Sequence, residues 1–176
     1  MIIFANDFDR PPPHFFDEMT KIILVLRHAQ SAGKQSGQRD YDRVLTREGE
    51  VKASALGQKL KLGNYNIDLI LSSDATRTRS TAELLNDTLD LSREKIQFKP
   101  ELYDALMLEW MDQIHKLTGD VQSVILVGHN PSLSMLATSF HTTVIDLAPC
   151  ELIGFEFNVD SWQEIKNSGK EILNIK

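Results

Sequence analysis

The sequence predicts an α/β fold, a three-layer sandwich in which a mainly parallel sheet carries helices on both faces. Short apolar runs, such as IILVL at 22–26 and SVILV at 123–127, are typical of strands that are covered on both sides. Longer stretches with helical spacing separate these runs, and strands that alternate with helices form parallel sheets. The chain of 176 residues is long enough for one hydrophobic core.

The composition excludes several classes of protein. With 41% hydrophobic and 25% charged residues, the chain has the balance of a globular domain. A formal net charge of -6 argues against sequence-independent nucleic-acid binding, which depends on many lysines and arginines. No apolar run approaches the roughly 20 residues that span a bilayer, and the single Cys150 fits a reducing compartment. We therefore expect a cytoplasmic protein with no nucleic-acid or membrane partner.

An arm and a strand are expected at the start of the chain. Residues 1–20 contain three consecutive prolines and no sustained period, which predicts a flexible N-terminal arm ahead of one domain over residues 21–176. The strand at 22–26 leads through Arg27 and His28 into a polar segment with glycines and serines, which is typical of a surface loop.

Two helices are expected around the second strand. Thr46 is a favourable N-cap residue, and apolar positions with helical spacing follow it. These positions are Val51, Ala55, Leu56, Leu60 and Leu62. A strand is predicted over 66–71, and Ser73 or Asp74 is expected to cap the next helix, which ends by Leu89. The expected inward residues of that helix are Ala82, Leu84 and Leu85.

The middle of the chain predicts two further strands, each followed by a helix. A short strand at 96–98 precedes a helix over 106–117, and the strand at 123–127 precedes a helix capped by Asn130 with Pro131 at its first position. Leu108, Met111 and Ile114 are expected on one side of the first helix, and Leu133, Leu136, Ala137 and Phe140 on the buried face of the second.

The C-terminal segment predicts strands alone. Residues 151–159 alternate partly between apolar and polar and predict a late strand that runs antiparallel to the others. Residues 162–165 and 171–175 predict a closing hairpin, with a turn at 167–169.

Histidines and arginines follow three of the predicted strands. Arg27 and His28 follow the first strand, Arg77 lies four residues after the Ser73 that ends the second, and His129 follows a later one. Ligand sites of open α/β sheets lie outside the carboxyl ends of the strands, so we expect these side chains to converge. A single histidine after a strand is more often a capping or surface residue. The prediction of a site therefore depends on their joint placement.

These residue types fit phosphoryl transfer. A neutral histidine such as His28 can attack phosphorus, and neighbouring arginines lower its pKa and keep it neutral. Arg27, Arg77 and His129 are expected to stabilise the phosphoryl oxygens as charge develops. Arg79, about 200° round the helix from Arg77, is expected on the solvated face. The sequence has no Gly-rich phosphate loop of the Walker type and no acidic metal cluster, so we expect transfer through a phosphohistidine without metal or cofactor.

Three segments resemble the histidine phosphatase superfamily, which also holds the phosphoglycerate mutases. They are LRHAQS at 26–31, the spacing of Ser73, Arg77 and Thr81, and VGHNP at 127–131. The resemblance extends from Lys21 to about Phe157 and implies a phosphoglycerate mutase-like fold. It implies His28 as the nucleophile and Arg27, Arg77 and His129 as its phosphate pocket.

Within this superfamily, the short length and the segment DYDRVLTREG are most similar to the SixA-type phosphohistidine phosphatases. The resemblance places Arg43 close to the pocket as a substrate-binding residue, with a loop ion pair to Asp40 or Asp42 as an equal alternative. Ala29 stands where the superfamily signature has glycine, a replacement that is seen in SixA-type members.

The general acid is the least defined residue. Glu101 in PELYDA is the leading candidate, although it can equally well be interpreted as an exposed carboxylate at the end of a strand. Asp104 is the second choice. An alkoxide leaving group needs a proton donor, whereas imidazole leaves phosphohistidine readily. The sequence therefore predicts a SixA-type phosphatase that acts on phosphohistidine in a phosphorylated protein. The alternatives are a phosphomonoesterase for a small metabolite, with Glu101 as acid, and a non-catalytic phosphate-binding module.

Overall fold

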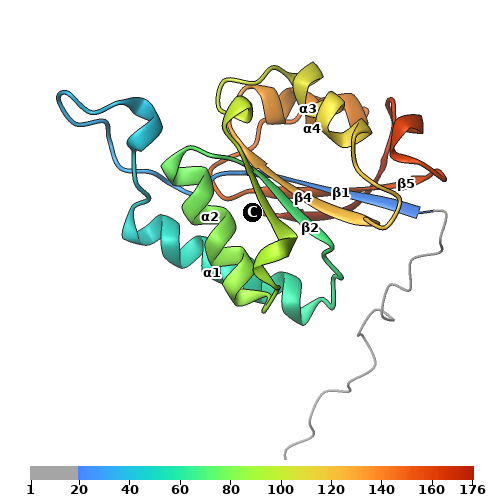
Figure 1. Cartoon of the computed structure of the whole chain (residues 1–176), viewed down its shortest axis with the longest axis horizontal. Coiled ribbons are helices and arrows are strands. Elements are labelled where there is room, and N and C mark those ends of the chain that lie inside the picture. The colour runs from blue at the N-terminus through green and yellow to red at the C-terminus, as the bar shows by residue number, and fades with distance from the viewer. Residues whose placement is uncertain (1–19) are drawn as a thin grey trace, which may run out of the picture.

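A six-stranded sheet lies between two layers of helices (Figure 1). The computed structural model describes residues 20–176, so the predicted arm lies outside the described residues apart from Thr20, which is the first residue of β1. The predicted three-layer α/β architecture is confirmed. Within the described part of the chain, no helix has both the length and the apolar content needed to cross a bilayer.

The sheet is mixed, with the order β3-β2-β4-β1-β5-β6. Its strands are β1 (Thr20–Arg27), β2 (Leu69–Ser73), β3 (Ile96–Lys99), β4 (Ser123–Gly128), β5 (Leu152–Asn158) and β6 (Lys170–Ile175). The pairs of β3, β2, β4 and β1 are parallel, whereas β5 is antiparallel to β1 and β6 is antiparallel to β5. This confirms the mainly parallel sheet and the antiparallel late strand.

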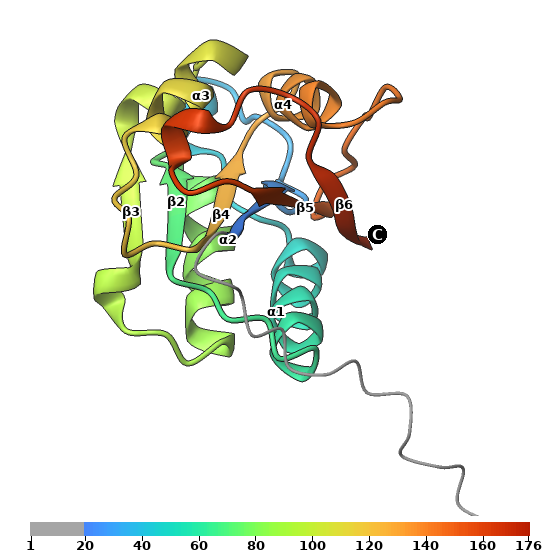
Figure 2. The ribbon, with the colours of Figure 1, turned by 90° about the vertical axis from the view of Figure 1, so that its right-hand side faces the viewer.

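Two helices cover each face of the sheet (Figure 2). They are α1 (Arg47–Leu62) and α2 (Thr76–Thr88) on one face, and α3 (Met107–His115) and α4 (Ser132–Phe140) on the other. Ile23 and Val25 of β1 pack toward α3 and α4, and Ile22, Leu24 and Leu26 pack toward α1 and α2. Burial on both faces explains the continuous apolar run, because each of these side chains is at most 2% exposed.

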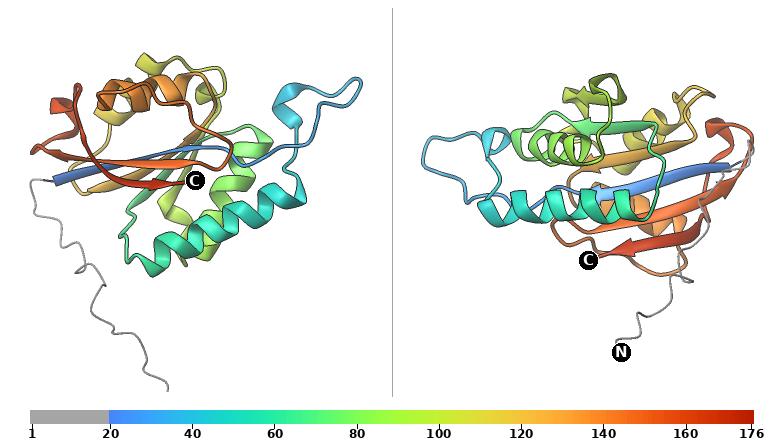
Figure 3. Two further views of the ribbon diagram at one scale, coloured as in Figure 1. Left: turned by 180° about the vertical axis from the view of Figure 1, so that it is seen from behind. Right: turned by 90° about the horizontal axis from the view of Figure 1, so that it is seen from below.

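The first helix forms where predicted, but its buried face differs. The Thr46 side chain caps α1 by accepting a hydrogen bond from the Gly49 N–H at 3.0 Å. Val51, Ala55 and Leu62 are exposed, and the buried residues are Gly49, Ala53, Leu56, Gly57 and Leu60. A Cβ at Gly57 would lie 2.8 Å from the Cβ of Thr88, so small residues let α1 approach α2. Figure 3 shows these two helices side by side on the same face of the sheet.

The turn before α2 differs from the prediction. Ala75 occupies the N-cap and no side chain caps the helix, so the predicted cap by Ser73 or Asp74 is wrong. Asp74 pairs with Arg79 instead. Arg79 lies over the ring of Phe98 at 3.8 Å and is half-exposed, as expected for the solvated face. The strand before this turn, β2, begins three residues later than the predicted range.

The predicted start of α4 is displaced by one residue. Pro131 is the N-cap and the helix begins at Ser132. Asn130 does not cap it, because the Asn130 amide donates to the Leu147 carbonyl at 2.9 Å and its oxygen accepts from Ser134 at 2.8 Å. The bond to Leu147 connects the start of the helix to the loop before β5.

Two further expectations are wrong. Leu108 does not share the buried side of α3, because it is 71% exposed, and Trp110 and Ile114 fill the core there. Residues 162–164 form a 3-10 helix rather than a strand, since Trp162 is buried and donates its Nε1–H to the Val121 carbonyl at 2.9 Å. The strand β6 therefore pairs with β5, not with residues 162–165.

Candidate active site

The carboxyl ends of three parallel strands bring the predicted residues together. Arg27 ends β1 opposite Gly128 of β4, so His28 and His129 leave the sheet side by side. Their ring centroids are 5.2 Å apart. Arg77, in the first turn of α2, reaches the same place, and its Nε lies 3.3 Å from His28 Nε2. The site thus combines two histidines with two arginines.

His28 is held in one tautomer. Its Nδ1 lies 2.8 Å from the Ala29 carbonyl oxygen, and because a carbonyl only accepts, Nδ1 carries the proton and Nε2 presents its lone pair. Burial, with smaller contributions from the charges of Arg77, Arg27 and Arg43, lowers the pKa of His28 to about 4, although the hydrogen bond to Ala29 acts in the opposite direction. The ring is therefore neutral at neutral pH and ready to act as a nucleophile.

His129 and Arg27 hold buried nitrogen atoms without partners. His129 Nε2 lies 3.0 Å from Ser73 Oγ, while its Nδ1 has no hydrogen-bond partner within residues 20–176. Arg27 donates one Nη1–H to the Leu147 carbonyl at 2.8 Å, but its buried Nε has no partner in the same part of the chain. A buried unsatisfied polar group costs about 1–3 kcal/mol. A bound anion would satisfy both atoms as donors.

Burial also keeps His129 neutral. Burial and, after it, the positive charge of Arg77 lower the pKa of His129 to about 3. Neutral rings beside several arginines leave the net positive charge of the site to the guanidinium groups, which suits an anionic ligand.

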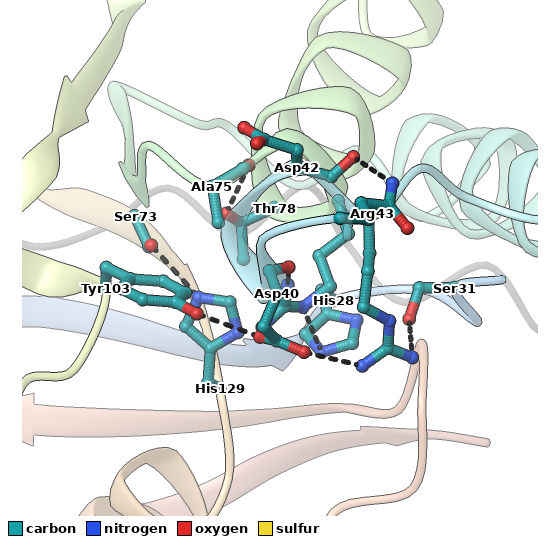
Figure 4. Close-up of polar contacts among 12 residues, drawn as sticks. His28, Ser31, Asp40, Asp42, Arg43, Ser73, Ala75, Thr78, Tyr103 and His129 are labelled. Atoms are coloured by element: carbon teal, nitrogen blue, oxygen red, sulfur yellow. Dashed lines mark hydrogen bonds and ion pairs between the residues drawn. The ribbon is translucent and has the colours of Figure 1, made fainter. Parts of the chain in front are cut away.

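Asp40 connects Arg77 with Arg43, and Figure 4 shows it between Tyr103 and Arg43. One carboxylate oxygen accepts from Arg77 Nη2 at 2.9 Å and from the Tyr103 hydroxyl at 2.9 Å, and the other accepts from Arg43 Nη1 at 3.0 Å. The Asp40 backbone carbonyl accepts from Arg77 Nη1 at 2.7 Å. The hydrogen bond from Arg43, followed by those from Tyr103 and Arg77, holds the pKa of Asp40 well below its usual range. Asp40 is therefore an anion.

Arg43 lies near the pocket and forms one of its two expected ion pairs, while its role in substrate binding stays a prediction. It forms the ion pair with Asp40, and it is close enough to His28 for its charge to lower the pKa of that histidine. Hydrogen bonds to the Ala32 carbonyl and the Ser31 hydroxyl, both at 2.9 Å, fix its guanidinium group. Asp42 pairs with Arg39 instead.

The two candidate acids occupy different places. Glu101 is exposed in a short 3-10 helix, Pro100–Leu102, and does not line the cavity beside the site. Asp104, the second choice, lines this cavity together with Arg77 and His129. Among the residues that the structure describes, no group of three or more His, Cys, Asp or Glu side chains could hold a metal ion.

Three residues of the site are not predicted from the sequence in these roles. They are Asp40 as the link between arginines, Tyr103 as its hydroxyl partner and Ser73 as the partner of His129. Asp40 lies in the SixA-like segment, which is the one signal that could indicate it. Its contacts depend on how the loop between β1 and α1 folds back onto α2.

Comparison with known proteins finds relatives over most of this chain. The family model of the histidine phosphatase superfamily (branch 1) matches residues 23–119. An uncharacterized chloroplastic protein of Arabidopsis thaliana is 29% identical over 168 residues, which are 91% of this chain and 76% of that protein. The mitochondrial serine/threonine-protein phosphatase PGAM5 of Xenopus tropicalis is 34% identical over 90 residues, which are 47% of this chain and 32% of that protein.

A solved structure agrees over a longer range. The structure of the candidate phosphohistidine phosphatase SixA from Agrobacterium tumefaciens is similar with a TM-score of 0.76 at 25% identity, covering 89% of this chain and 97% of that one. This similarity confirms the phosphoglycerate mutase-like fold. His28 and Arg77 lie inside the range of the family match, whereas His129 lies beyond it, so the place of His129 is known from its geometry.

Proposed function

Because the chain belongs to the histidine phosphatase superfamily (branch 1), we propose that this phosphatase hydrolyses phosphohistidine in a phosphorylated protein, through a covalent intermediate on His28 and without a metal ion or cofactor. The observation that carries the proposal is the state of His28. Its proton is held on Nδ1 by Ala29, and its unprotonated Nε2 accepts a hydrogen bond from Arg77 Nε at 3.3 Å. The similarity to a SixA-type structure supports phosphohistidine as the substrate.

In the first step, the lone pair of His28 Nε2 attacks phosphorus. The new P–N bond forms as the bond between phosphorus and the substrate imidazole breaks. The imidazole keeps that electron pair and leaves as a neutral ring, because its other ring nitrogen carries a proton. The phosphoryl oxygens accept hydrogen bonds from Arg27 Nε, Arg77 and His129. The Ser73 hydroxyl donates a hydrogen bond to His129 Nε2, so the neutral His129 ring carries its own proton on Nδ1. These donors act where charge develops in the transition state.

In the second step, water attacks the phosphorylated His28. The oxygen of water forms a bond to phosphorus, the P–Nε2 bond breaks, and its electron pair returns to the ring as the lone pair. The remaining proton of water goes to solvent or to the released phosphate. The bond from Nδ1 to Ala29 stays intact through both steps, so the ring keeps its orientation.

Charge in the site fits a phosphoryl dianion. Arg27, Arg43 and Arg77 bring three positive charges, and Asp40 brings one negative charge. The three guanidinium groups supply the positive charge that a divalent cation supplies in other phosphoryl-transfer enzymes. We therefore expect the reaction to proceed without a metal ion.

We also propose a location and a partner class. Cys150 is a buried free thiol, which fits a reducing compartment such as the cytoplasm. The net charge of -6 disfavours nucleic acid as a partner, so the expected substrate is a phosphorylated protein or a small phosphomonoester.

A phosphomonoesterase for a small metabolite is the second candidate. The observation in its favour is Asp104, which lines the same cavity as Arg77 and His129. An alkoxide leaving group needs a proton donor, and a donor in this place would contribute about 10²–10⁴-fold to the rate.

A turnover experiment tests these alternatives. The purified full chain is given a phosphohistidine-bearing protein and, separately, a panel of small phosphomonoesters, and brief reactions are quenched in base. We expect faster turnover of phosphohistidine and a base-stable, acid-labile phosphate on His28, which His28→Ala abolishes and His115→Ala retains. Preference for a monoester supports the second candidate. If the protein turns over neither substrate but still binds phosphate, the result supports the non-catalytic phosphate-binding module.

A further inference from the structure

A cavity of about 590 Å³ opens from the phosphoryl-binding residues. Its walls come from residues 103–108 and from residues 130–135, and we call the space between them the leaving-group groove. Arg77 and His129 line the groove, whereas His28 does not. An in-line attack sends the leaving group away from the nucleophile. The group attached to phosphorus therefore points from His28 into this groove.

The walls of the leaving-group groove present large apolar side chains to solvent. Leu106 and Leu108 are each 71% exposed and Met135 is 55% exposed. They are three of the seven large hydrophobic residues that are exposed within residues 20–176. Apolar side chains gathered around one concave site mark a binding surface, because covering them releases water.

The start of α3, which carries the two leucines, is fixed from its inner side. Leu106 occupies the N-cap of α3, where it offers no side-chain hydrogen bond although a polar residue is favoured there. Glu109 accepts from the Leu106 backbone N–H at 2.6 Å, and Trp110 is fully buried in the core. The leucines are thus held outward over the groove rather than being free to collapse inward.

The chemistry of the groove disfavours a second anionic group on the substrate. Asp40 and Asp104 line the groove together with the apolar walls, while Arg77 stands at the phosphoryl end. A second phosphate would approach two acidic residues and aliphatic carbon. An apolar group would bury surface against the same walls.

We infer that the leaving-group groove binds a large apolar side chain next in sequence to the phosphohistidine of a protein substrate, an inference that rests on the proposed function. The volume of the cavity lies within the range of about 300–1,000 Å³ that small-molecule sites show, so it has room for more than an imidazole ring. The occupant is a segment in which leucine, methionine or phenylalanine flanks the phosphohistidine.

The test uses two phosphohistidine peptides that differ only in the following residue, leucine or serine. The parent chain and Leu106→Ser, Leu108→Ser and the double variant are compared by the ratio of kcat/KM for the two peptides. The parent should prefer the leucine peptide about tenfold, which corresponds to about 1.4 kcal/mol, and the double variant should reduce this preference below about twofold. Leu62→Ser, at an 84% exposed leucine of α1, should keep the parent ratio.

The outcomes separate the inference from the proposed function. Equal kcat/KM for both peptides in the parent, or an unchanged preference in the double variant, overturns the groove while phosphohistidine hydrolysis stands. If the protein hydrolyses neither peptide but hydrolyses 1-naphthyl phosphate rapidly, the proposed function is overturned, and the groove binds the aryl group of an ester instead. A preference that Leu62→Ser also removes overturns the assignment of the preference to the groove.

Discussion

Lowering the pH from 7.5 to 5 should destabilise the folded protein through its two active-site histidines. Burial lowers the pKa of His28 to about 4 and that of His129 to about 3, whereas an unfolded histidine has a pKa of about 6.5. Between these values the unfolded chain binds protons that the folded protein excludes. The free energy of unfolding therefore falls as the pH drops below 6.5, and it stops falling near the folded pKa values.

The magnitude follows from the distance between the pH and the unfolded pKa. Each pH unit below 6.5 costs about 1.36 kcal/mol per excluded proton, so 1.5 units cost about 2 kcal/mol for each histidine and about 4 kcal/mol for both. Both side chains belong to residues that are only 9% exposed, so solvent screening reduces these values little. The depressed pKa of Asp40 acts only below the unfolded value of about 4 and does not contribute in this range.

Urea unfolding at pH 7.5 and pH 5 measures this loss. His28→Asn and His129→Asn should each recover about 2 kcal/mol of the loss at pH 5, and the double variant should be nearly independent of pH over this range. His115→Asn, at the end of α3 and outside the site, should lose as much as the parent. If the double variant loses stability as steeply as the parent, or if the parent loses less than about 1 kcal/mol, the two histidines are not held neutral by burial.

Three further predictions concern the reaction. Turnover should survive EDTA, because guanidinium groups supply the positive charge; a rate that EDTA abolishes and Mg²⁺ restores contradicts this mechanism. Arg77→Ala and His129→Ala should each lower kcat/KM by about 10²-fold and weaken inhibition by vanadate, and an unaltered rate in steady-state assays would remove that residue from the pocket. On an alkyl phosphate Asp104→Asn should lower the rate by about 10²–10⁴-fold and Glu101→Gln should leave it unchanged, because only the first lines the cavity; the reverse order would restore the sequence-based choice.

The fold could be predicted because its signals are local. The apolar run of β1 is continuous since both faces of that strand are buried, and the similar run at 123–127 forms its parallel neighbour β4. The packed face of α1 could not be read from large apolar residues, because Gly49 and Gly57 form part of the contact and Val51 faces solvent. Helices that approach each other closely need small residues at their contact, and small residues add little to the hydrophobic pattern of the sequence.

The site was predictable only where strand ends determine it. His28 and His129 follow neighbouring parallel strands, so the strand-end rule places them together. Tyr103 reaches the site because a short 3-10 helix turns the chain after β3, and its hydroxyl meets Asp40 across 63 positions of sequence. A single sequence contains no sign of such a contact, because both residues are also common on loop surfaces.

Asp40 gives the arrangement of the site a mechanical explanation. Its carbonyl and carboxylate engage Arg77 Nη1 and Nη2, the two terminal nitrogens, and so turn the remaining Nε–H toward His28 Nε2. An arginine side chain loses about 2 kcal/mol of rotamer entropy when it is fixed, and Asp40 imposes this loss during folding rather than during substrate binding. The guanidinium is then already oriented when the phosphoryl group arrives beside Nε and the nucleophile. Under this condition electrostatic stabilisation needs no reorganisation at the moment of reaction.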